Sequence, residues 1–584
     1  MELKYTDEKA VLLLIALLKE NGIKRVIVSP GVTNYAFVGS IQHDDFFQLY
    51  SCVDERSAAY MACGMAAETD EPVVITCTGA TSERNYLPGL TEAYYRKLPV
   101  LAVCGHRGVS AIGHLHDQQL DRRNEPVDVA NVQVWLPFVK DQEDEQLCYN
   151  EINKAILALS KHGGGPAMIN LCTHYSPNMS VQNLPNVQRV AYYTCSDKLP
   201  VLPEGRIAIV LGSHRLFTPE ETEIIDAFCA SYDAVVICDH TSGYYGKYAV
   251  HSSLIFIQDK KSELAAARLC LYSGEISGDS CGVLSMWSEE TWRIGEDGEF
   301  RNRTGKVTKV FEMSLPQFCQ NYRQDGETQN IYLNQCREEY SNIYSKIPEL
   351  PFSNVWIAKH LAPRIPPNNS SICFGINNSL RSWNLFDIPQ GVRGMANVGG
   401  YGIDGTISSA VGRAIANPDK IVYCVLGDLA FFYDMNVLGN RYIGKNLRIL
   451  LINNGLGDEF RMSKSPSYKA LGEDVRPYVA AEGHYGHIET TIVRAYVESI
   501  GYRYLTASSK EEFLKLVDEF VSPEINQSIV LEVKIKAEDD TEAVDLISHI
   551  VMRDNHESLK KRLKKKIKSI VREEKISAIQ TLLK

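Results

Sequence analysis

The sequence lacks any hydrophobic run long enough to cross a membrane, and it lacks paired cysteines. No stretch of 18 consecutive apolar residues occurs, whereas a membrane-spanning helix needs about 20. The 15 cysteines are scattered without a C-x-x-C pair, and several stand inside apolar, strand-like runs. This pattern favours buried, reduced thiols in a cytoplasmic protein over a disulfide framework.

Basic residues are also in the minority, except at the C-terminal end. The 61 Lys and Arg stand against 72 Asp and Glu, which gives a net charge of −11. Residues 553–584 alone hold 11 Lys and Arg but only 4 Asp and Glu, so the rest of the chain is more acidic still. Because an acidic surface repels nucleic acid, we do not expect a nucleic-acid partner.

The apolar N-terminal segment carries Glu2, Asp7 and Glu8 and has no small-residue cleavage site. We interpret it as a first helix rather than a signal peptide. Further along, apolar strand-like runs alternate with helical segments, which is typical of parallel α/β sheets. A chain of 584 residues is too long for one hydrophobic core, so several domains are expected.

We expect an α/β protein of three doubly wound parallel-sheet domains, at residues 1–185, 200–340 and 350–545, followed by a basic helical tail at 546–584. Residues 186–200 are expected to be a linker. Residues 300–313 are expected to form a hairpin or a late pair of strands. The middle domain is expected to begin with strands at Ile207–Leu211 and Val235–Cys238 and a helix from about Pro219 to Tyr232 between them, with Thr218 as its N-cap. No dinucleotide fingerprint follows the first of these strands, because the residues there read GSHR, and we assign this domain a structural role.

Two strand-like runs in the last third of the chain end in polar residues. Ile421–Leu426 is followed by Gly427 and Asp428, and Leu447–Ile452 by Asn453 and Asn454, with a helical stretch at 433–443 between them. Ligands of open α/β sheets bind at the carboxyl ends of strands. An aspartate and an asparagine placed there can supply hard oxygen ligands to one Mg²⁺, which would hold a diphosphate.

This segment resembles the diphosphate-binding motif of thiamine-diphosphate-dependent enzymes, a GDG followed about 25 residues later by NN. Here Leu429 takes the third position. The text GDLAFFYDMNVL is most similar to GDLSALYDLNAL of the menaquinone-pathway synthase family, which joins 2-oxoglutarate to isochorismate. The resemblance implies that Gly427, Asp428, Leu429 and Asn454 bind the cofactor, and that Asp428, Asn454 and the Leu456 carbonyl bind Mg²⁺. If the GDL segment or the NN segment occurred alone, an ordinary strand end without a ligand would be the alternative interpretation.

Two further segments extend the resemblance. Asn378 and Ser379 stand where the family has a segment that packs on the aminopyrimidine ring, and residues 397–405 resemble the synthase text NRGASGIDG. The resemblance implies that Ile403 is the apolar wedge that bends thiamine diphosphate and so brings its reacting atoms together. Plain core packing is the alternative for Ile403.

Glu55 is the candidate catalytic residue of the N-terminal domain. It stands at the start of a helix, where a carboxylate is favoured by the helix dipole. The text VDERSAAYMACGMA resembles the segment that opens the main helix of the family's pyrimidine-binding domain. The resemblance implies that Glu55 hydrogen-bonds N1′ of the aminopyrimidine and controls a proton there. It also implies that Gly31, Gly79 and Asn85 lie in segments facing the cofactor.

A polar loop at residues 113–119 holds further candidates. Gln118 falls at the position of an active-site glutamine in acetohydroxyacid synthases, and His114 and His116 fall near the histidine pair of pyruvate decarboxylases. A proton-transfer role and a plain surface loop both stay open for the histidines. Arg107 is a candidate anchor for a substrate carboxylate through its bidentate fork, with a surface arginine as the alternative.

Two departures from the synthase family concern the substrate. Where that family carries arginines for isochorismate, this chain has Thr33, in the text SPGVTN, and Val398. Losing two guanidinium forks removes the charge-assisted bonds that fix a substrate with several carboxylates. The departure implies that the cofactor machinery is kept and that isochorismate is not the acceptor.

The resemblance implies a transferase or lyase that depends on thiamine diphosphate and Mg²⁺. It would decarboxylate a small 2-oxo acid and transfer the resulting acyl-anion equivalent to a carbonyl acceptor. A non-oxidative 2-oxo acid decarboxylase that releases an aldehyde, and a catalytically silent scaffold of the same fold, are the alternatives. The three domains would be the pyrimidine-binding, middle and diphosphate-binding domains. The active site would be shared between subunits of a homodimer or homotetramer.

The tail places Leu559, Leu563, Ile567 and Ile570 at helical spacing amid lysines. A basic amphipathic helix of this kind can lie on an anionic membrane surface. Packing on the acidic body of the protein's own oligomer is the favoured interpretation, because runs of charge on helices are usually solvated faces.

Overall fold

The computed structural model describes residues 4–324, 326–367, 369–462, 464–484 and 491–552. The chain divides into two compact units, Met1–Pro200 with Glu290–Met313, and Val201–Glu289 with Ser314–Lys584. Over the described ranges no helix is long and apolar enough to cross a membrane. The domain boundaries expected from the sequence stay a prediction.

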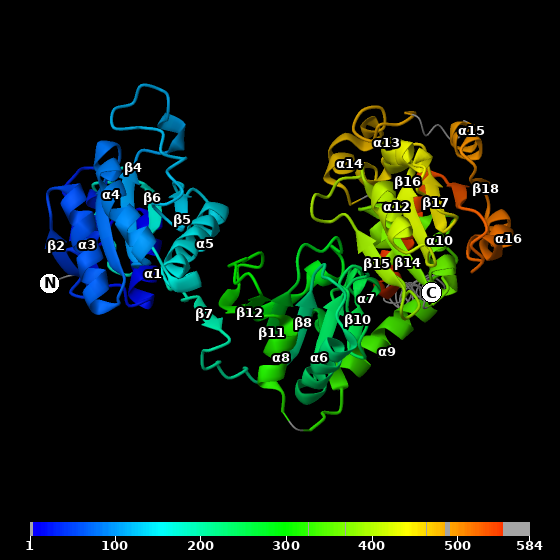
Figure 1. The fold of residues 1–584 in the computed structure, drawn as a ribbon, viewed down its shortest axis with the longest axis horizontal. Helices are drawn as coiled ribbons and strands as arrows, with labels where there is room; N and C mark the ends of the chain where they lie inside the picture. Colours follow the sequence, from blue (N-terminus) through cyan, green and yellow to red (C-terminus); the bar gives the residue numbers. More distant parts are fainter. Residues whose placement is uncertain (1–3, 325, 368, 463, 485–490, 553–584) are drawn as a thin grey trace, which may run out of the picture. The chain divides into compact units, whose positions relative to one another are not determined.

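The first unit is built on a six-stranded parallel sheet in the order β2-β1-β3-β4-β6-β5 (Figure 1). Its strands are β1 (Arg25–Val28), β2 (Gln48–Ser51), β3 (Val73–Thr78), β4 (Val100–His106), β5 (Val132–Leu136) and β6 (Ala167–Cys172). Helices α1 (Lys9–Glu20), α2 (Tyr35–Ile41) and α5 (Gln142–Ala158) pack on one face, and α3 (Glu55–Thr69) and α4 (Thr81–Arg96) on the other. Neighbouring strand residues alternate between the two cores, Val74 in one and Ile75 in the other.

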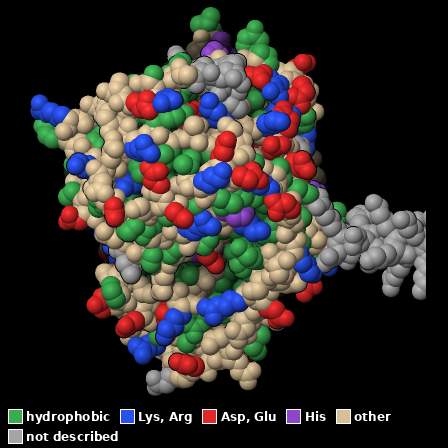
Figure 2. Space-filling model, turned by 90° about the vertical axis from the view of Figure 1, so that its right-hand side faces the viewer, with side chains coloured by type: hydrophobic (Ala, Val, Ile, Leu, Met, Phe, Trp, Pro, Cys, Tyr) green, Lys and Arg blue, Asp and Glu red, His purple; other side chains and the backbone are tan. Residues whose placement is uncertain are grey.

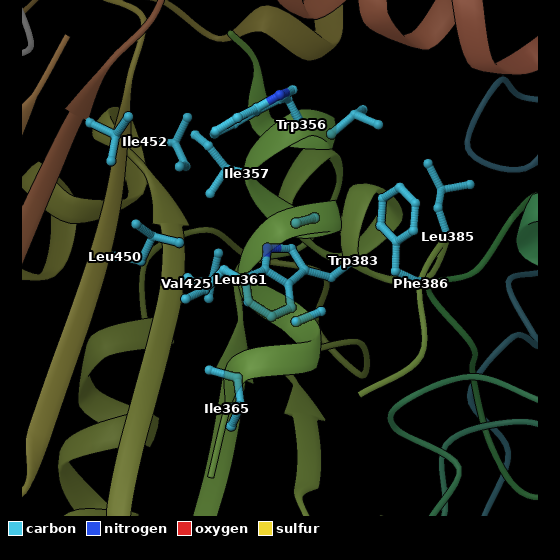
Figure 3. Packing of buried hydrophobic residues seen from close by; sticks show 14 of the residues in the cluster. Trp356, Ile357, Leu361, Ile365, Trp383, Leu385, Phe386, Val425, Leu450 and Ile452 are labelled. Carbon is cyan, nitrogen blue, oxygen red and sulfur yellow. The ribbon is translucent and has the colours of Figure 1, made fainter. Parts of the chain in front are cut away.

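The second unit contains a six-stranded parallel sheet in the order β15-β14-β16-β17-β19-β18. Its strands are β14 (Ser370–Phe374), β15 (Arg393–Ala396), β16 (Ile421–Gly427), β17 (Leu447–Asn453), β18 (Arg503–Ala507) and β19 (Ile529–Lys534). One face is covered by α10 (Asn354–Leu361), α11 (Asn378–Trp383), α16 (Lys510–Phe520) and α17 (Ala537–Ser548), and the other by α12 (Thr406–Ala416), α13 (Asp428–Asp434) and α15 (Ile492–Ser499). Figure 3 shows Trp356 and Leu361 of α10 and Trp383 of α11 beside Val425 and Leu450 of the sheet.

The two six-stranded sheets share one strand order. Numbered from its own first strand, each reads 2-1-3-4-6-5. In both sheets the order reverses between strands 1 and 3, which in the second unit are β14 and β16. Neighbouring connections leave in opposite directions at such a point, so a crevice opens beyond the carboxyl ends of these strands.

Seven further strands also pair in parallel. They are β12 (Trp287–Gly295), β13 (Val307–Glu312) and β7 (Ala191–Thr194), which form one ladder, and β10 (Ala249–His251), β9 (Val235–Cys238), β8 (Ile207–Leu211) and β11 (Ala266–Ser273), which form another. The remaining helices are α6 (Pro219–Tyr232), α7 (Ser253–Phe256), α8 (Leu315–Tyr322), α9 (Ile331–Ser345) and α14 (Pro466–Leu471). The expected α/β class with three parallel-sheet regions is therefore confirmed.

Two expectations for the middle region are wrong. Residues 186–200, expected to be a linker, contain β7, and residues 300–313 form no hairpin, because β13 pairs in parallel with β12 and β7. β7 has its partner β13 far away in the sequence, and the connection from β12 to β13 is a parallel one, so local patterns do not reveal either pairing. The expected basic helix of the tail, with Leu559 to Ile570, lies outside the described residues.

Candidate functional site

The two motif strands lie side by side. β16 and β17 pair in parallel with Gly427 opposite Ile452, so Asp428 and Asn454 both follow at the carboxyl edge of the sheet. Helix α13 begins directly at Asp428, earlier than the expected helical stretch at 433–443, and a 3₁₀ turn (Met435–Gly439) ends it. The early start has a physical reason, because a carboxylate at the first helical position interacts favourably with the helix dipole.

Asp428 joins the ends of the two strands. Its side chain is 2% exposed, and its two oxygens accept the backbone N–H groups of Leu429 and Gly455, both at 2.8 Å. Burial raises the pKa of Asp428 to about 7, although these hydrogen bonds oppose the rise. A carboxylate held in this way, away from water, is a strong attractor for a cation.

A cavity of about 180 Å³ opens beyond these strand ends, in the second unit. Its walls come from the residues that follow β14, β16 and β17, together with Ile403 and two residues of the flanking helices, Asn354 and Asp540. Eight residues that the sequence predicts as cofactor or metal contacts line it, namely Asn378, Ser379, Ile403, Gly427, Asp428, Leu429, Asn454 and Leu456. The fold thus brings together, at the switch point of this sheet, the residues predicted for a diphosphate-binding domain.

The donor atoms in this cavity fit Mg²⁺ with a diphosphate. The Asp428 carboxylate, the Asn454 side-chain oxygen and the Leu456 carbonyl are hard oxygen donors of the kind that Mg²⁺ prefers. In the ranges that the structure describes, no group of three or more His, Cys, Asp or Glu is placed to bind a metal. These three donors carry one negative charge and do not fill the coordination shell of Mg²⁺. The oxygens of a diphosphate would supply the missing ligands and the missing negative charge.

A buried network behind the asparagine turn sets its shape. Asn453 Nδ2 donates to Glu532 Oε1 at 2.7 Å, and the Tyr504 hydroxyl donates to Glu532 Oε2 at 2.6 Å. The Gly455 N–H also reaches Asn453 Oδ1 at 3.2 Å. The sequence prediction does not include Glu532, although a glutamate inside the apolar run 529–535 is a usable signal. This network orients the turn that carries Asn454 and Leu456.

Three more carboxylates line the cavity, and none of them is predicted from the sequence. Burial raises the pKa of Asp458 to about 8, with the charge of Asp540 adding to the rise, and burial raises the pKa of Asp540 to about 7. Glu459 accepts a hydrogen bond from Arg381 Nη1 at 2.5 Å. The acidic pair in the text NNGLGDEF is the signal that would have pointed to Asp458 and Glu459.

Glu55 lies in the first unit as the first residue of α3, where it is half-buried. The preceding Asp54 caps the helix, because its side chain accepts the Ser57 N–H at 2.8 Å. Helix α3 packs tightly on α4, since a Cβ added to Gly89 would overlap Ala59. The cap and this close packing fix the position of Glu55 at the carboxyl end of the sheet's second strand.

Three other first-unit candidates hold the turn after β1 in place. A Cβ on Gly31 would overlap the Thr78 side chain, and one on Gly79 would lie 2.9 Å from the Gly105 carbonyl. The buried Thr33 hydroxyl donates to the Gly105 carbonyl at 3.0 Å and accepts the Gly79 N–H at 3.2 Å. The hydroxyl of Thr33 is therefore engaged within the fold.

The polar-loop candidates lie at the surface of the same unit. Arg107 forms a bidentate pair with Asp117 at 2.6 and 2.9 Å and donates from Nε to the Tyr175 hydroxyl at 3.0 Å. The guanidinium of Arg107 is thus already paired with Asp117 and bonded to Tyr175. The other candidates of this region are exposed, namely Asn85, His114, His116 and Gln118.

The N-terminal part of the chain is similar to a known protein family. The family model for the thiamine pyrophosphate enzyme N-terminal TPP binding domain matches residues 9–124. This range includes β1 to β4 and Glu55. The predicted resemblance to thiamine-diphosphate-dependent enzymes is confirmed by this match, and the finding supports a thiamine-diphosphate-dependent enzyme.

Several proteins that are similar to this chain over most of its length carry the name 2-succinyl-5-enolpyruvyl-6-hydroxy-3-cyclohexene-1-carboxylate synthase. The chain is 27% identical to the one from Phocaeicola vulgatus over 555 residues, 92% of this chain and 97% of the relative. It is 28% identical to that from Bacteroides thetaiotaomicron over 559 residues, 91% and 96% of the two chains. It is 26% identical to that from Desulfotalea psychrophila over 524 residues, 85% and 94%. The resemblance to this synthase family therefore extends over most of the chain.

Proposed function

We propose that the chain is an enzyme dependent on thiamine diphosphate and Mg²⁺ that decarboxylates a small 2-oxo acid and transfers the resulting acyl-anion equivalent to a carbonyl acceptor. The observation that carries the proposal is the cavity at the switch point, where Asp428, Asn454 and Leu456 present hard oxygens at two adjacent strand ends. Thiamine diphosphate, when bound, supplies the electron sink that such a decarboxylation requires.

The residues of the cavity take distinct roles in this proposal. Asp428, Asn454 and the Leu456 carbonyl hold Mg²⁺ and through it the diphosphate, beside the backbone of Gly427 and Leu429. Asn378 and Ser379 face the aminopyrimidine. Ile403 lines the cavity and also packs against the core on the α12 face of the sheet, so it is supported from behind, as a wedge that bends the cofactor must be.

Glu55 holds the proton at N1′ of the aminopyrimidine in the proposed enzyme. The family resemblance implies an active site shared by subunits, so the proposal includes a homodimer or homotetramer. Exposed apolar side chains near Glu55 in the sequence support an interface, since Val53 is 75% and Tyr60 48% exposed. Large apolar groups exposed together are typical of contact surfaces.

The proposed acceptor is a carbonyl compound other than isochorismate. Both positions at which the synthase family has an arginine are unable to pair with a carboxylate here. The Thr33 hydroxyl is engaged by Gly79 and Gly105, and Val398 is an apolar residue buried in the core. At this point the proposal departs from the activity that the relatives' name describes.

Arg107, Gln118, His114 and His116 are proposed substrate-side residues. The histidines and Gln118 are exposed on their loop, and Arg107 would have to exchange Asp117 for a substrate carboxylate. We also propose a cytoplasmic enzyme without a nucleic-acid partner. On the face in Figure 2, Lys and Arg side chains are interspersed with Asp and Glu, so that face presents no continuous basic field.

A binding titration combined with a product assay tests the proposal. Thiamine diphosphate is titrated with and without Mg²⁺, and CO₂ release is measured for a panel of 2-oxo acids with and without aldehydes, ketones and isochorismate. Mg²⁺-dependent binding with an acceptor-dependent product is the expected result. Free aldehyde without acceptor dependence identifies the decarboxylase alternative. A product with isochorismate refutes the proposed change of acceptor, and absence of cofactor binding refutes the enzyme proposal.

A further inference from the structure

The cavity has an unusual balance of charge. Four carboxylates line it, from Asp428, Asp458, Glu459 and Asp540, and its described lining residues include no Lys, Arg or His. In the proposed function Asp428 binds Mg²⁺, and Glu459 is paired with Arg381 at 2.5 Å. Asp458 and Asp540 are left without an assigned role, although they are only 4% and 3% exposed.

Within the described ranges, neither of these two aspartates forms an ion pair with a Lys, Arg or His side chain. Both carboxylate oxygens of Asp458 are buried without a hydrogen-bond partner in the described part of the chain. Asp540 Oδ1 accepts the backbone N–H of Asn354 at 2.6 Å, which orients the group but brings no positive charge. An ionised carboxylate removed from water is strongly disfavoured unless it is paired.

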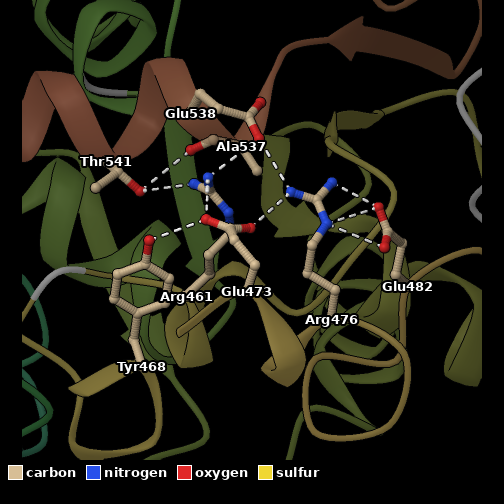
Figure 4. A network of polar contacts seen from close by, with 8 residues as sticks. All are labelled: Arg461, Tyr468, Glu473, Arg476, Glu482, Ala537, Glu538 and Thr541. Carbon is tan, nitrogen blue, oxygen red and sulfur yellow. Dashed lines mark hydrogen bonds and ion pairs between the residues drawn. The ribbon is translucent and has the colours of Figure 1, made fainter. Parts of the chain in front are cut away.

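Arg461, in the segment that carries Asp458, contacts Glu473, Glu538 and Thr541, as Figure 4 shows. Arg461 donates to Glu473 at 3.2 Å and pairs with Glu538 at 3.1 Å. Arg476 pairs with the same two glutamates and with Glu482. The two arginines are outnumbered by the three glutamates that they pair with, so the network has no net positive charge, although the Arg461 Nε–H has no hydrogen-bond partner in the described ranges.

The same network holds the two aspartates in fixed positions. Asp458 lies in the 3₁₀ turn just before Arg461, and Asp540 lies in the first turn of α17 just after Glu538. The Arg461–Glu538 pair therefore links the two segments that carry them. Supporting contacts of this kind are what a binding site needs to keep its donors in place without a ligand.

We propose that Asp458 and Asp540 form a cation-binding subsite in the cavity wall, distinct from the Mg²⁺ position at Asp428. Its occupant is a hard cation, either a second metal ion or the ammonium group of a substrate. Carboxylate pairs bind both, because a hard metal ion coordinates carboxylate oxygens and an ammonium group donates hydrogen bonds to them. The inference goes beyond the proposed function, since cation binding at this subsite does not require thiamine diphosphate.

In the first arm of the test, Mn²⁺ is titrated into the full chain in the absence of thiamine diphosphate, and its binding is measured by calorimetry. Asp458→Asn is compared with Asp428→Asn and with Asp474→Asn, a control in which an exposed aspartate of the 3₁₀ turn Gly472–Val475 is changed. If a metal ion is the occupant, Asp428→Asn and Asp474→Asn keep the site, and Asp458→Asn weakens it at least tenfold.

The second arm uses 1,3-diaminopropane and follows the thermal midpoint of the same proteins. A ligand that binds only the folded state raises the midpoint. If an ammonium group is the occupant, the midpoint rises for the wild type and Asp474→Asn but not for Asp458→Asn. Asp540→Asn repeats both arms, so that the subsite is tested by a second variant if Asp458→Asn does not fold.

Equal responses of wild type and both subsite variants to Mn²⁺ and to the diamine would overturn the subsite, and would mean that the two carboxyls share a proton instead. A thiamine diphosphate titration on the same samples separates this failure from that of the proposed function. Intact cofactor binding without a cation response overturns the subsite alone. A cation response without cofactor binding overturns the proposed function alone.

Discussion

Mg²⁺ binding at Asp428 should depend on pH in a way that an exposed aspartate would not produce. Burial raises the pKa of Asp428 from 3.8 to about 7 in the metal-free chain. Carboxylates bind metal ions in the deprotonated form, so Mg²⁺ must displace a proton below that pKa. The apparent Mg²⁺ affinity should therefore fall about tenfold for each pH unit below about 7 and level off above it.

The magnitude separates a buried ligand from an exposed one. Between about pH 7.5 and pH 5.5, a group with a pKa near 7 loses most of its ionised fraction, which weakens Mg²⁺ roughly 20-fold to 30-fold. A carboxylate with an ordinary pKa would lose less than about twofold over the same range. Calorimetric titration of Mg²⁺ in the presence of thiamine diphosphate measures this directly. The pH profile of Mg²⁺ and free thiamine diphosphate provides the correction for the cofactor's own protons.

The same pKa has a consequence for stability, and its sign can be worked out. In the unfolded chain Asp428 ionises near pH 3.8, whereas in the folded chain it stays protonated up to about pH 7. The metal-free folded state therefore loses stability as pH rises between these values, by at most about 4 kcal/mol. Asp428→Asn should be more stable than the wild type at about pH 8, and the difference should vanish below about pH 4, as measured by urea denaturation.

Two results would refute the assignment of Asp428. One is a corrected Mg²⁺ affinity that does not change over this pH range. The other is an Asp428→Asn protein that binds Mg²⁺ and thiamine diphosphate as tightly as the wild type. Asp474→Asn, which changes an exposed aspartate, should behave like the wild type in both measurements.

Three further predictions concern other parts of the chain. Glu55→Gln should slow hydrogen–deuterium exchange at C2 of bound thiamine diphosphate by about 100-fold or more, with little change in cofactor affinity. The exchange is measured by NMR, and an exchange rate equal to that of the wild type would contradict the proposed role of Glu55. Ile403→Ala should lower kcat by roughly tenfold or more at saturating cofactor, and an effect confined to cofactor affinity would argue against a wedge. Thr218→Ala removes the capping box of α6 and should lower the free energy of unfolding by about 1 kcal/mol in urea; an unchanged midpoint would show that water replaces the cap.

Features with local causes are predicted well from the sequence. Helix α6 is expected at Pro219–Tyr232 and is observed there, because Thr218, the proline after it and Glu221 form a capping box that needs no distant partner. Strands β8 and β9 are also observed at their predicted bounds. Their apolar, β-branched runs report burial on both faces of a parallel sheet.

Features that depend on remote partners are not predicted. β7 lies in a segment that looks like a linker, and it is a strand because β13 pairs with it. β13 in turn follows a Thr-Gly pair typical of a hairpin, yet its neighbours β12 and β7 run parallel to it. Turn residues are compatible with several connections, and the choice among them is made by the surfaces that must be buried.

The candidate site divides in the same way. The sequence by itself determines that Asp428 and Asn454 follow two buried strands, because strand character and the polar residues after it are local, and parallel strands place their carboxyl ends at one edge. Only the tertiary structure decides that Asn453 meets Glu532, 79 positions away, and that Asp458 and Asp540 line one cavity without an ion pair to any described cationic side chain. Burial and charge pairing are properties of the surroundings of a side chain. Those surroundings exist only after segments remote in sequence have packed together.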